Sequence, residues 1–262
     1  MKAIIFLNAI FILFFATGCE ILHPEGLITL DNIFEALDAA ARPIKQQNAK
    51  ELPAVKVDEP PMIDGKLNDA AWRNAPQGTD FSDRRRGGAP AEDQSTIMLV
   101  YTDDAIYFAG YFFDSEPDGI VARQVEDQIR PAGEDWVSLT IDPFHTHQFR
   151  DRTFFMANPL GSKFVSHLPP FVGMAEVSGM WKAAASIVDD GWIVEMEIPW
   201  TMLNYPETDE PIDIGINVDR GHHRIGANTW WSKVDFVEDD RVDGHWTGVL
   251  PPPKLSIFPD DQ

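Results

Sequence analysis

Basic side chains are scarce in this sequence of 262 residues, because 21 Lys and Arg accompany 42 Asp and Glu and leave a formal net charge of −21 at pH 7. Proteins that bind DNA or RNA neutralise phosphates with Lys and Arg, so this balance excludes a nucleic-acid partner. It argues equally against an electrostatic attraction to anionic lipid. Cysteine is scarcer still, since a single residue excludes an internal disulfide, a thiolate zinc site and a c-type haem attachment.

Signatures of catalysis are missing as well. The sequence contains no Gly-x-Ser-x-Gly elbow, no phosphate-binding loop and no dinucleotide-binding fingerprint. Carboxylates are so numerous that some pair would lie at a glycosidase separation by chance, so their presence does not indicate a hydrolase. Two histidine pairs, His145 with His147 and His222 with His223, lack an identifiable third ligand. We therefore predict surface histidines rather than a zinc site.

The N-terminus has the layout of an export signal. After Lys2 comes an apolar run over residues 3–15, which is too short to span a bilayer, where about 20 residues are needed. The only cysteine, Cys19, follows three small residues, and this arrangement resembles the bacterial lipoprotein signal, in which the cysteine receives lipid. We predict that residues 1–18 are a signal peptide and that Cys19 carries a lipid anchor. The alternative is an ordinary signal peptide whose removal leaves a free thiol.

The remaining chain changes character near residue 53. Residues 19–52 are predicted to be a lipid-anchored tether with a short helix, in which Asp31 could cap an apolar stripe over 33–41. Beyond it the apolar residues alternate. Trp192, Val194, Met196 and Ile198 share one face of a predicted strand, and Ile193, Glu195 and Glu197 share the other, as in a half-buried strand.

Ten such strands are predicted, over 94–101, 105–113, 135–141, 152–158, 162–167, 181–187, 192–198, 212–219, 228–234 and 246–250. One helical turn is predicted after residue 52, at 199–203. Short strands at this spacing predict an all-β fold, a two-sheet antiparallel β-sandwich over residues 53–250. Residues 251–262 are predicted to be a polar tail.

Five segments occur in an order that resembles the carbohydrate-binding modules of family 9. They are IDGKLNDAAW (63–72), MLVYTDDAIYFAGYFFD (98–114), EDWVSLTIDP (134–143), FFMANPLG (154–161) and WKAAASIVDDGWIVEMEIPW (181–200). The pattern is most similar to the family-9-like domain that precedes a C-terminal barrel in bacterial envelope proteins. We expect no barrel here, because the sequence ends soon after Leu250.

The resemblance implies a sandwich that binds saccharide without catalysis, in support of a partner hydrolase. In sugar-binding members two tryptophans clamp one sugar ring, and the first lies in the loop before the strand that matches EDWVSLTIDP. Here that loop, 128–133, has no aromatic residue but contains Arg130, and Asp135 follows it. The second clamp position precedes the last strand, where Phe236 and Arg241 occur. Ser138 stands where the family has an acidic contact.

Tryptophan supplies the predicted binding platform, because sugars stack on aromatic rings and their hydroxyls need carboxylate, amide or guanidinium partners. Trp230 and Trp231 are adjacent in a predicted strand, so their rings point to opposite faces. One is expected in the core and the other on the outer face or under a loop, unless both are buried. The predicted ligand-binding residues are Trp230, Trp231, Trp246, Phe236, Asn228, Arg241, Arg130 and Asp135. The predicted core tryptophans are Trp72, Trp136, Trp181 and Trp192.

Several alternatives stay open at this level. Arg84, Arg85 and Arg86 form the only basic run, which predicts a solvated loop or, alternatively, a contact for an acidic glycan. We predict no cofactor and no metal ligand set, although the resemblance implies that structural Ca²⁺ could be held. The predicted location is the bacterial cell envelope, as an outer-membrane lipoprotein, since Glu20 follows Cys19. The other functions considered are an accessory lipoprotein that binds a protein partner, and a sandwich that holds haem between its sheets.

Overall fold

The computed structural model describes residues 22–23, 26–27, 49–128, 130–146, 151–169, 177–232 and 244–254. The chain divides into two units, Met1–Gln47 and Asn48–Gln262. In the first unit, β1 (Leu22–His23) and β2 (Gly26–Leu27) form an antiparallel pair. The predicted helix at 33–41 and the predicted lipidation site Cys19 lie outside the described residues.

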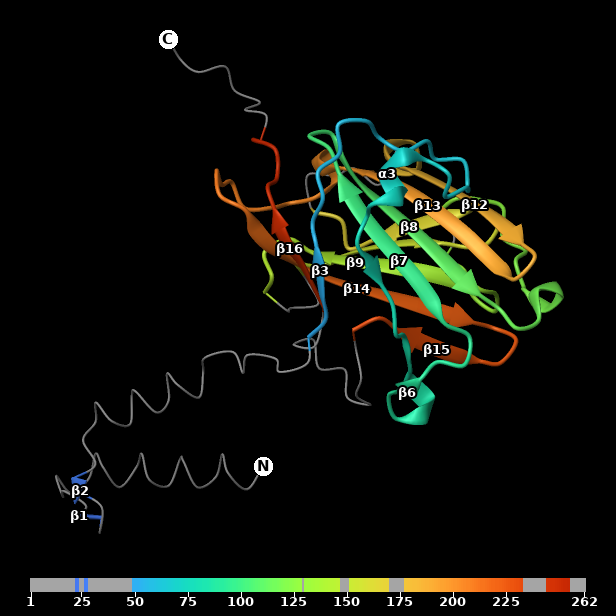
Figure 1. Cartoon of the computed structure of the whole chain (residues 1–262), viewed down its shortest axis with the longest axis horizontal. Helices are drawn as coiled ribbons and strands as arrows, with labels where there is room; N and C mark the ends of the chain where they lie inside the picture. Colours follow the sequence, from blue (N-terminus) through green and yellow to red (C-terminus); the bar gives the residue numbers. More distant parts are fainter. Residues whose placement is uncertain are drawn as a thin grey trace. The chain divides into compact units, whose positions relative to one another are not determined.

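The second unit consists of two sheets that face each other (Figure 1). The smaller sheet has the strand order β12 (Lys182–Val188), β13 (Gly191–Pro199), β8 (Ala105–Phe113), β7 (Ser95–Tyr101) and β4 (Gln77–Gly78). The larger sheet has the order β11 (Lys163–Ser166), β10 (Thr153–Ala157), β9 (Trp136–Asp142), β14 (Ile212–His222), β15 (Ala227–Trp230), β5 (Ser82–Asp83) and β6 (Ala89–Pro90). The strand β16 (Gly244–Val249) also pairs with β14, and β3 (Glu51–Pro53) pairs with β16 in parallel.

The predicted all-β antiparallel sandwich is confirmed, and each of the ten predicted strands is present with ends shifted by a few residues. The prediction of a single helical turn after residue 52 is wrong. The 3₁₀ turn η4 (Trp200–Met202) matches it, but α3 (Ala70–Arg73), α4 (Val177–Met180), η1 (Arg84–Arg86) and η2 (Pro117–Gly119) are additional. Helices of three or four residues are too short to show a 3.6-residue period, so apolar patterning does not reveal them.

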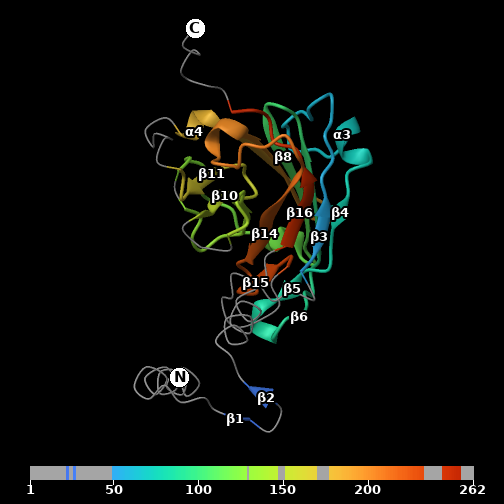
Figure 2. The ribbon, with the colours of Figure 1, turned by 90° about the vertical axis from the view of Figure 1, so that its left-hand side faces the viewer.

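Alternation along the strands builds the core between the two sheets. The predicted inner face of β13 is confirmed, because Trp192, Val194, Met196 and Ile198 are buried in one cluster. Val137, Leu139 and Ile141 of β9 belong to the same cluster from the opposite sheet. In Figure 2, β10 and β11 lie on one side of the sandwich, and β4 and α3 lie on the other.

The outer face of the smaller sheet is covered rather than exposed. A second cluster forms there. Trp72 of α3 and Ala75, which follows the helix, pack against Met98, Val100, Tyr107 and Ala109 of the sheet. Glu195, which the alternation of β13 places on this face, is therefore completely buried instead of half-exposed. The covering segment begins before the sheet in sequence and has no strand pattern of its own, so the alternation of β13 could not disclose it.

One buried carboxylate attaches this cover to the sheet. Glu195 Oε1 accepts a hydrogen bond from the indole Nε1 of Trp72 at 2.8 Å. Glu195 Oε2 accepts three more, from the backbone amides of Asp64 (3.1 Å), Gly65 (2.8 Å) and Lys66 (3.2 Å). The IDG turn and the tryptophan of the first sequence motif therefore meet on the same side chain. Gly65 has φ +80°, and a Cβ there would lie 2.7 Å from Ser186 Oγ, so the turn needs glycine.

Replacing Glu195 with glutamine should lower the free energy of unfolding by about 1–3 kcal/mol, because the new NH₂ group must face N–H donors in place of an acceptor. Urea unfolding measures the change. Glu197→Gln is the matched control on the same face of β13, where the carboxylate pairs with Lys182 Nζ at 2.9 Å near the surface. That control should change stability by at most about 1 kcal/mol. Equal, small effects would contradict the anchoring role.

The burial of Glu195 also predicts that the stability of the protein depends on pH. Burial raises the pKa of the Glu195 carboxyl above its ordinary value of 4.5, and the bonds from Trp72 and the three amides oppose this shift without cancelling it. The folded state therefore holds this proton more tightly than the unfolded state. The stability of the wild type relative to Glu195→Gln should fall as pH rises through and above 4.5.

Candidate functional site

A hollow opens on the outer face of the larger sheet, where neighbouring strands present their alternate side chains. Paired positions form one row across the sheet, consisting of Asp219, Ser138, Met156 and Phe164. The next row consists of Asn217, Thr140, Phe154 and Ser166. The hollow has a volume of about 360 Å³, within the range of small-molecule sites. We call it the Trp136 hollow, after the half-buried indole that lines it.

Trp136 occupies this position because its neighbour across the strands is a glycine. Gly221 of β14 pairs with Trp136 of β9, and a Cβ on Gly221 would lie 2.2 Å from the indole Nε1. The ring therefore lies against the bare backbone of β14. The prediction that Trp136 is a core residue is wrong, because its strand sends Val137 and Leu139 inward and leaves Trp136 with Ser138 outside.

The remaining lining combines rings with polar groups. Phe154 and Phe164 are half-buried, Ser138 is buried, and Asp219 is half-buried at the side formed by β14. His167 follows β11 with φ +58°, and its ring contacts that of Phe154 with 5.2 Å between centroids. A sugar has a flat C–H face and a hydroxyl rim, and this mixture offers contacts for both.

Arg130 lines the hollow from the segment that precedes β9. Hydrogen bonds of buried side chains hold this part of the chain in place. Glu134 Oε2 accepts bonds from the backbone amides of Arg123 at 2.7 Å and Gln124 at 3.1 Å. Asn158, from the Asn-Pro-x-Gly turn, donates to the Gln124 carbonyl at 2.7 Å. The predicted candidate Arg130 thus lines the hollow. The indole that lies there with it is Trp136, not one of the predicted platform tryptophans.

Asp135 has a different position from the one predicted. Only 1% of it is exposed, and its two carboxylate oxygens accept the amides of Val121 at 2.7 Å and His223 at 3.2 Å. The structure places this predicted ligand contact in the interior, where each of its two oxygens accepts a backbone amide. It fixes the path of the segment that carries Arg130.

Trp231 and Trp246 are core residues rather than a binding platform. Their exposed fractions are 2% and 0%, and both belong to the cluster between the sheets. Trp246 lies opposite Ile214 of β14, and its ring meets the ring of Tyr101 edge-on at 5.6 Å. The prediction of an exposed platform at these two residues is wrong. Alternation along β16 turns Trp246 inward, and Trp231, which directly follows β15, points into the core on the face opposite to Trp230.

Trp230 points to the opposite face from Trp231, as predicted, but it too is buried, with 6% exposed. The Arg84 guanidinium carbon lies 4.9 Å from the centroid of its ring. Arg84 is therefore half-buried, whereas Arg85 and Arg86 are exposed on the turn η1, as predicted for a solvated loop. The open alternative in which both adjacent tryptophans are buried is the one that the structure contains.

Of the remaining candidate residues, Asn228 and His145 lie within the described part of the chain. Asn228 is exposed and pairs with Gly221, so it lies on the same face as the Trp136 indole. Phe236 and Arg241 lie outside the described residues, as does His147. His145 is half-buried, and its ring meets that of His245 at 4.5 Å.

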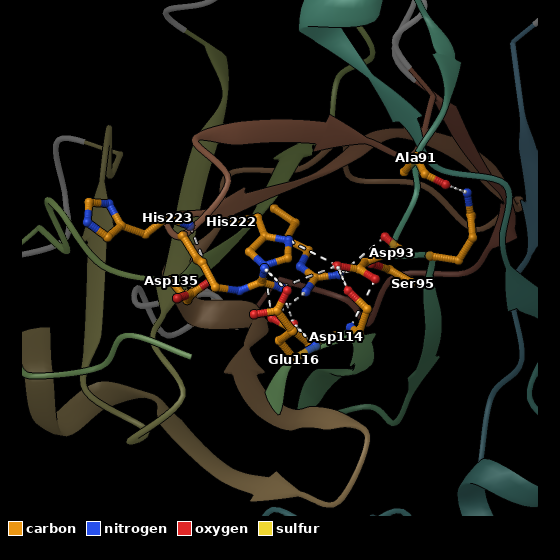
Figure 3. Close-up of polar contacts among 12 residues, drawn as sticks. Ala91, Asp93, Ser95, Asp114, Glu116, Asp135, His222 and His223 are labelled. Atoms are coloured by element: carbon orange, nitrogen blue, oxygen red, sulfur yellow. Dashed lines mark hydrogen bonds and ion pairs between the residues drawn. The ribbon is translucent and has the colours of Figure 1, made fainter. Parts of the chain in front are cut away.

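A second group of polar residues joins the ends of the two sheets (Figure 3). His222 Nε2 lies 2.9 Å from Asp114 Oδ2, and Nδ1 lies 3.6 Å from Asp93 Oδ2. These three residues could present ligand atoms to a cation, since the atoms lie within 4.8 Å of one another. Arg224 Nη2 lies 2.7 Å from Asp114 Oδ1, however, and Arg220 Nη2 lies 3.9 Å from Asp114 Oδ2.

This group is better described as an ion network than as a metal centre, because two guanidinium groups already balance its carboxylates. Burial, and then the charge of Arg220, lower the pKa of His222 and favour its neutral form. The prediction of a surface histidine is wrong for His222, which is 2% exposed, and confirmed for His223. Structural calcium elsewhere in the chain stays a prediction.

Sequence reasoning missed Trp136, Phe154, Phe164 and Asp219 as members of one site. A usable signal was present in the segment WVSLTID, because its alternation places Trp136 with Ser138 and Thr140. The partners of that face on β10, β11 and β14 come from distant segments, and only strand pairing brings them together.

Comparison with known proteins gives the fold an independent basis. No protein-family model matches the chain. A family 9 carbohydrate-binding module from Caldicellulosiruptor kristjanssonii, solved with cellotriose, has a TM-score of 0.53 and 16% identity, covering 81% of this chain and 100% of the module. A family 9 module from the same organism, solved with glucose, has a TM-score of 0.55 and 16% identity, covering 80% of this chain and 100% of the module. The predicted family-9-like fold is thus confirmed.

A sequence relative is also known. Endo-1,4-beta-xylanase A of Thermoanaerobacterium saccharolyticum is 29% identical over 176 residues, which are 65% of this chain. The match spans only 14% of the length of the xylanase. The relationship therefore concerns a small part of that protein.

Replacing Trp246 with alanine should lower the free energy of unfolding by about 3–5 kcal/mol, as expected for truncating a large core ring. Denaturant titration followed by far-UV circular dichroism provides the measurement. Phe113→Ala serves as the control, since Phe113 is 39% exposed at the end of β8. A cost for Trp246→Ala no larger than that of the control would be inconsistent with the core position.

Proposed function

We propose that this chain binds carbohydrate non-covalently and that the ligand occupies the Trp136 hollow. The observation that carries the proposal is the half-buried indole on the outer face of the larger sheet, with Arg130 and Asp219 among the polar groups around it. Aromatic rings beside a few directed polar groups are the usual composition of a small-molecule site. In the described residues the other seven tryptophans are buried, which leaves Trp136 as the indole accessible to a ligand.

The chemistry of such binding follows from the lining. The indole of Trp136 and the rings of Phe154 and Phe164 offer apolar surface to the C–H face of a sugar. Arg130 can donate to ring and hydroxyl oxygens, and Asp219 can accept from hydroxyl groups. No bond in the ligand needs to break, so the proposed role is recognition, in support of a hydrolase that acts on the same glycan.

The relatives support a choice of ligand class. The solved modules with this fold contain glucose and cellotriose, and the sequence relative is named as a xylanase. We therefore propose neutral glycans of the cellulose or xylan type as ligands. The haem alternative receives less support, because Trp192, Phe112 and Phe155 are among the fully buried rings that fill the space between the sheets.

We also propose that the protein is exported and held in the bacterial envelope, at the outer membrane, by lipid on Cys19. The apolar run at 3–15 and the small residues before Cys19 support this location. Within the described ranges the structure contains no helix that is long and apolar enough to cross a membrane. A lipid anchor would place a glycan-binding sandwich at the cell boundary, together with any partner hydrolase.

Replacing Trp136 with alanine should weaken cellotriose or xylotriose binding by about 30-fold or more, since truncating a central aromatic contact costs roughly 2 kcal/mol. Isothermal titration calorimetry with glucose, cellotriose, xylose and xylotriose measures the affinities. Phe113→Ala, an aromatic truncation on the other sheet, should leave each affinity within about twofold. Folded wild-type protein that binds none of these sugars would refute the proposal, as would unchanged binding by Trp136→Ala.

Replacing Cys19 with serine should move the protein from the membrane fraction to the soluble fraction, because the acyl chains can no longer be attached. Fractionation of producing cells and mass spectrometry of the mature N-terminus test this. A wild-type protein whose mature N-terminal cysteine carries no lipid would eliminate the anchor. In that case the ordinary signal peptide is the correct alternative.

A further inference from the structure

A second hollow of about 390 Å³ lies beside the first. Its lining includes Pro143 and Phe144, which follow β9, and Leu168 and Pro169, which follow β11. Asn204, next to η4, contributes from a third segment. We call this the Phe144 hollow, because Phe144 is 44% exposed there.

The two hollows share a residue. His167 lines both, with its ring edge-on to Phe154 of the Trp136 hollow. Its backbone carbonyl accepts a bond at 3.2 Å from Thr153 Oγ1, and Thr153 lines the Phe144 hollow. His167 is therefore held between the two, with φ +58°, a backbone conformation that is costly for a residue other than glycine. His167 therefore lies at the boundary between the two hollows, which adjoin each other.

The Phe144 hollow, like the first, combines an aromatic ring with polar groups. It has an exposed aromatic ring, and its polar lining includes Asp151, Thr153 and Asn204. Asn204 Oδ1 accepts a hydrogen bond from Lys254 Nζ at 3.2 Å, so its amide is oriented by the C-terminal end of the described chain. Each hollow alone has the volume of a small-molecule site.

Because the two hollows adjoin at His167, we infer that the ligand is an extended oligosaccharide that passes over His167 and occupies both. The first sugar unit contacts Trp136, and a later unit stacks on Phe144. This inference rests on the proposed function and specifies its ligand as a glycan chain rather than a single sugar or a chain end. A chain of repeating sugars presents the same ring face and the same hydroxyls at intervals, so two hollows of like chemistry suit it.

The test is the dependence of affinity on the length of the oligosaccharide, measured by isothermal titration calorimetry on the full-length protein. The probes are glucose, cellobiose, cellotriose and cellopentaose, with the matching xylose series. For the wild type, affinity should rise by about tenfold or more between the disaccharide and the pentasaccharide, as expected for one additional aromatic contact. In Phe144→Ala this rise should disappear, while disaccharide affinity stays within about twofold.

Two further variants separate the subsite from general damage. Phe144→Tyr keeps a ring and should retain the rise, and Phe113→Ala removes an exposed ring elsewhere and should also retain it. Sugar binding that does not depend on length, or a rise that survives in Phe144→Ala, would overturn the second subsite while leaving the Trp136 hollow intact. Failure of folded wild-type protein to bind any of the sugars would overturn the proposed function, and this inference with it.

Discussion

Strand β9 sends Val137, Leu139 and Ile141 into the core and leaves Trp136, Ser138 and Thr140 on the outer face. The rest of the second unit depends on this alternation. The strands β10 and β14 pair with β9, and β11 pairs with β10, so each must turn its core residues to the same face of the sheet. A shift of register by one residue would bring the polar set into the core and the apolar set to the surface. The packing that stabilises the sandwich therefore also determines which side chains line the hollow.

Acidic residues have a second role besides the solubility that a charge of −21 confers. Glu195, Glu134 and Asp135 are 0%, 5% and 1% exposed, and each accepts hydrogen bonds from backbone amides of irregular segments. An amide that is buried without a partner costs about 1–3 kcal/mol, so these carboxylates let segments without strand pairing lie against the sheets. Two of these three hold the segment that carries Arg130, which connects stability with the candidate site.

A fold shared at 16% identity leaves the binding surface free to differ. Trp136, Phe154 and Phe164 of the candidate site lie on the paired strands β9, β10 and β11, and the loop before β9 contributes Arg130. A residue on a paired strand has a better-defined position than one on a loop, because the ladder hydrogen bonds restrict it. The candidate site therefore depends on the larger sheet more than on its connecting loops.

The period-two patterns and turn residues were sufficient to predict the sandwich and the inner face of β13, because alternation is a local property that follows from backbone geometry. Alternation over residues 136–142 also predicts that Trp136 lies on the outer face, because it groups Trp136 with Ser138 and Thr140 rather than with Val137 and Leu139. Tertiary structure alone decided the burial of Glu195 beneath the 63–72 segment. It also decided which distant strands carry the partners of Trp136, because pairing between residues far apart in the chain depends on how all the strands bury their apolar faces together.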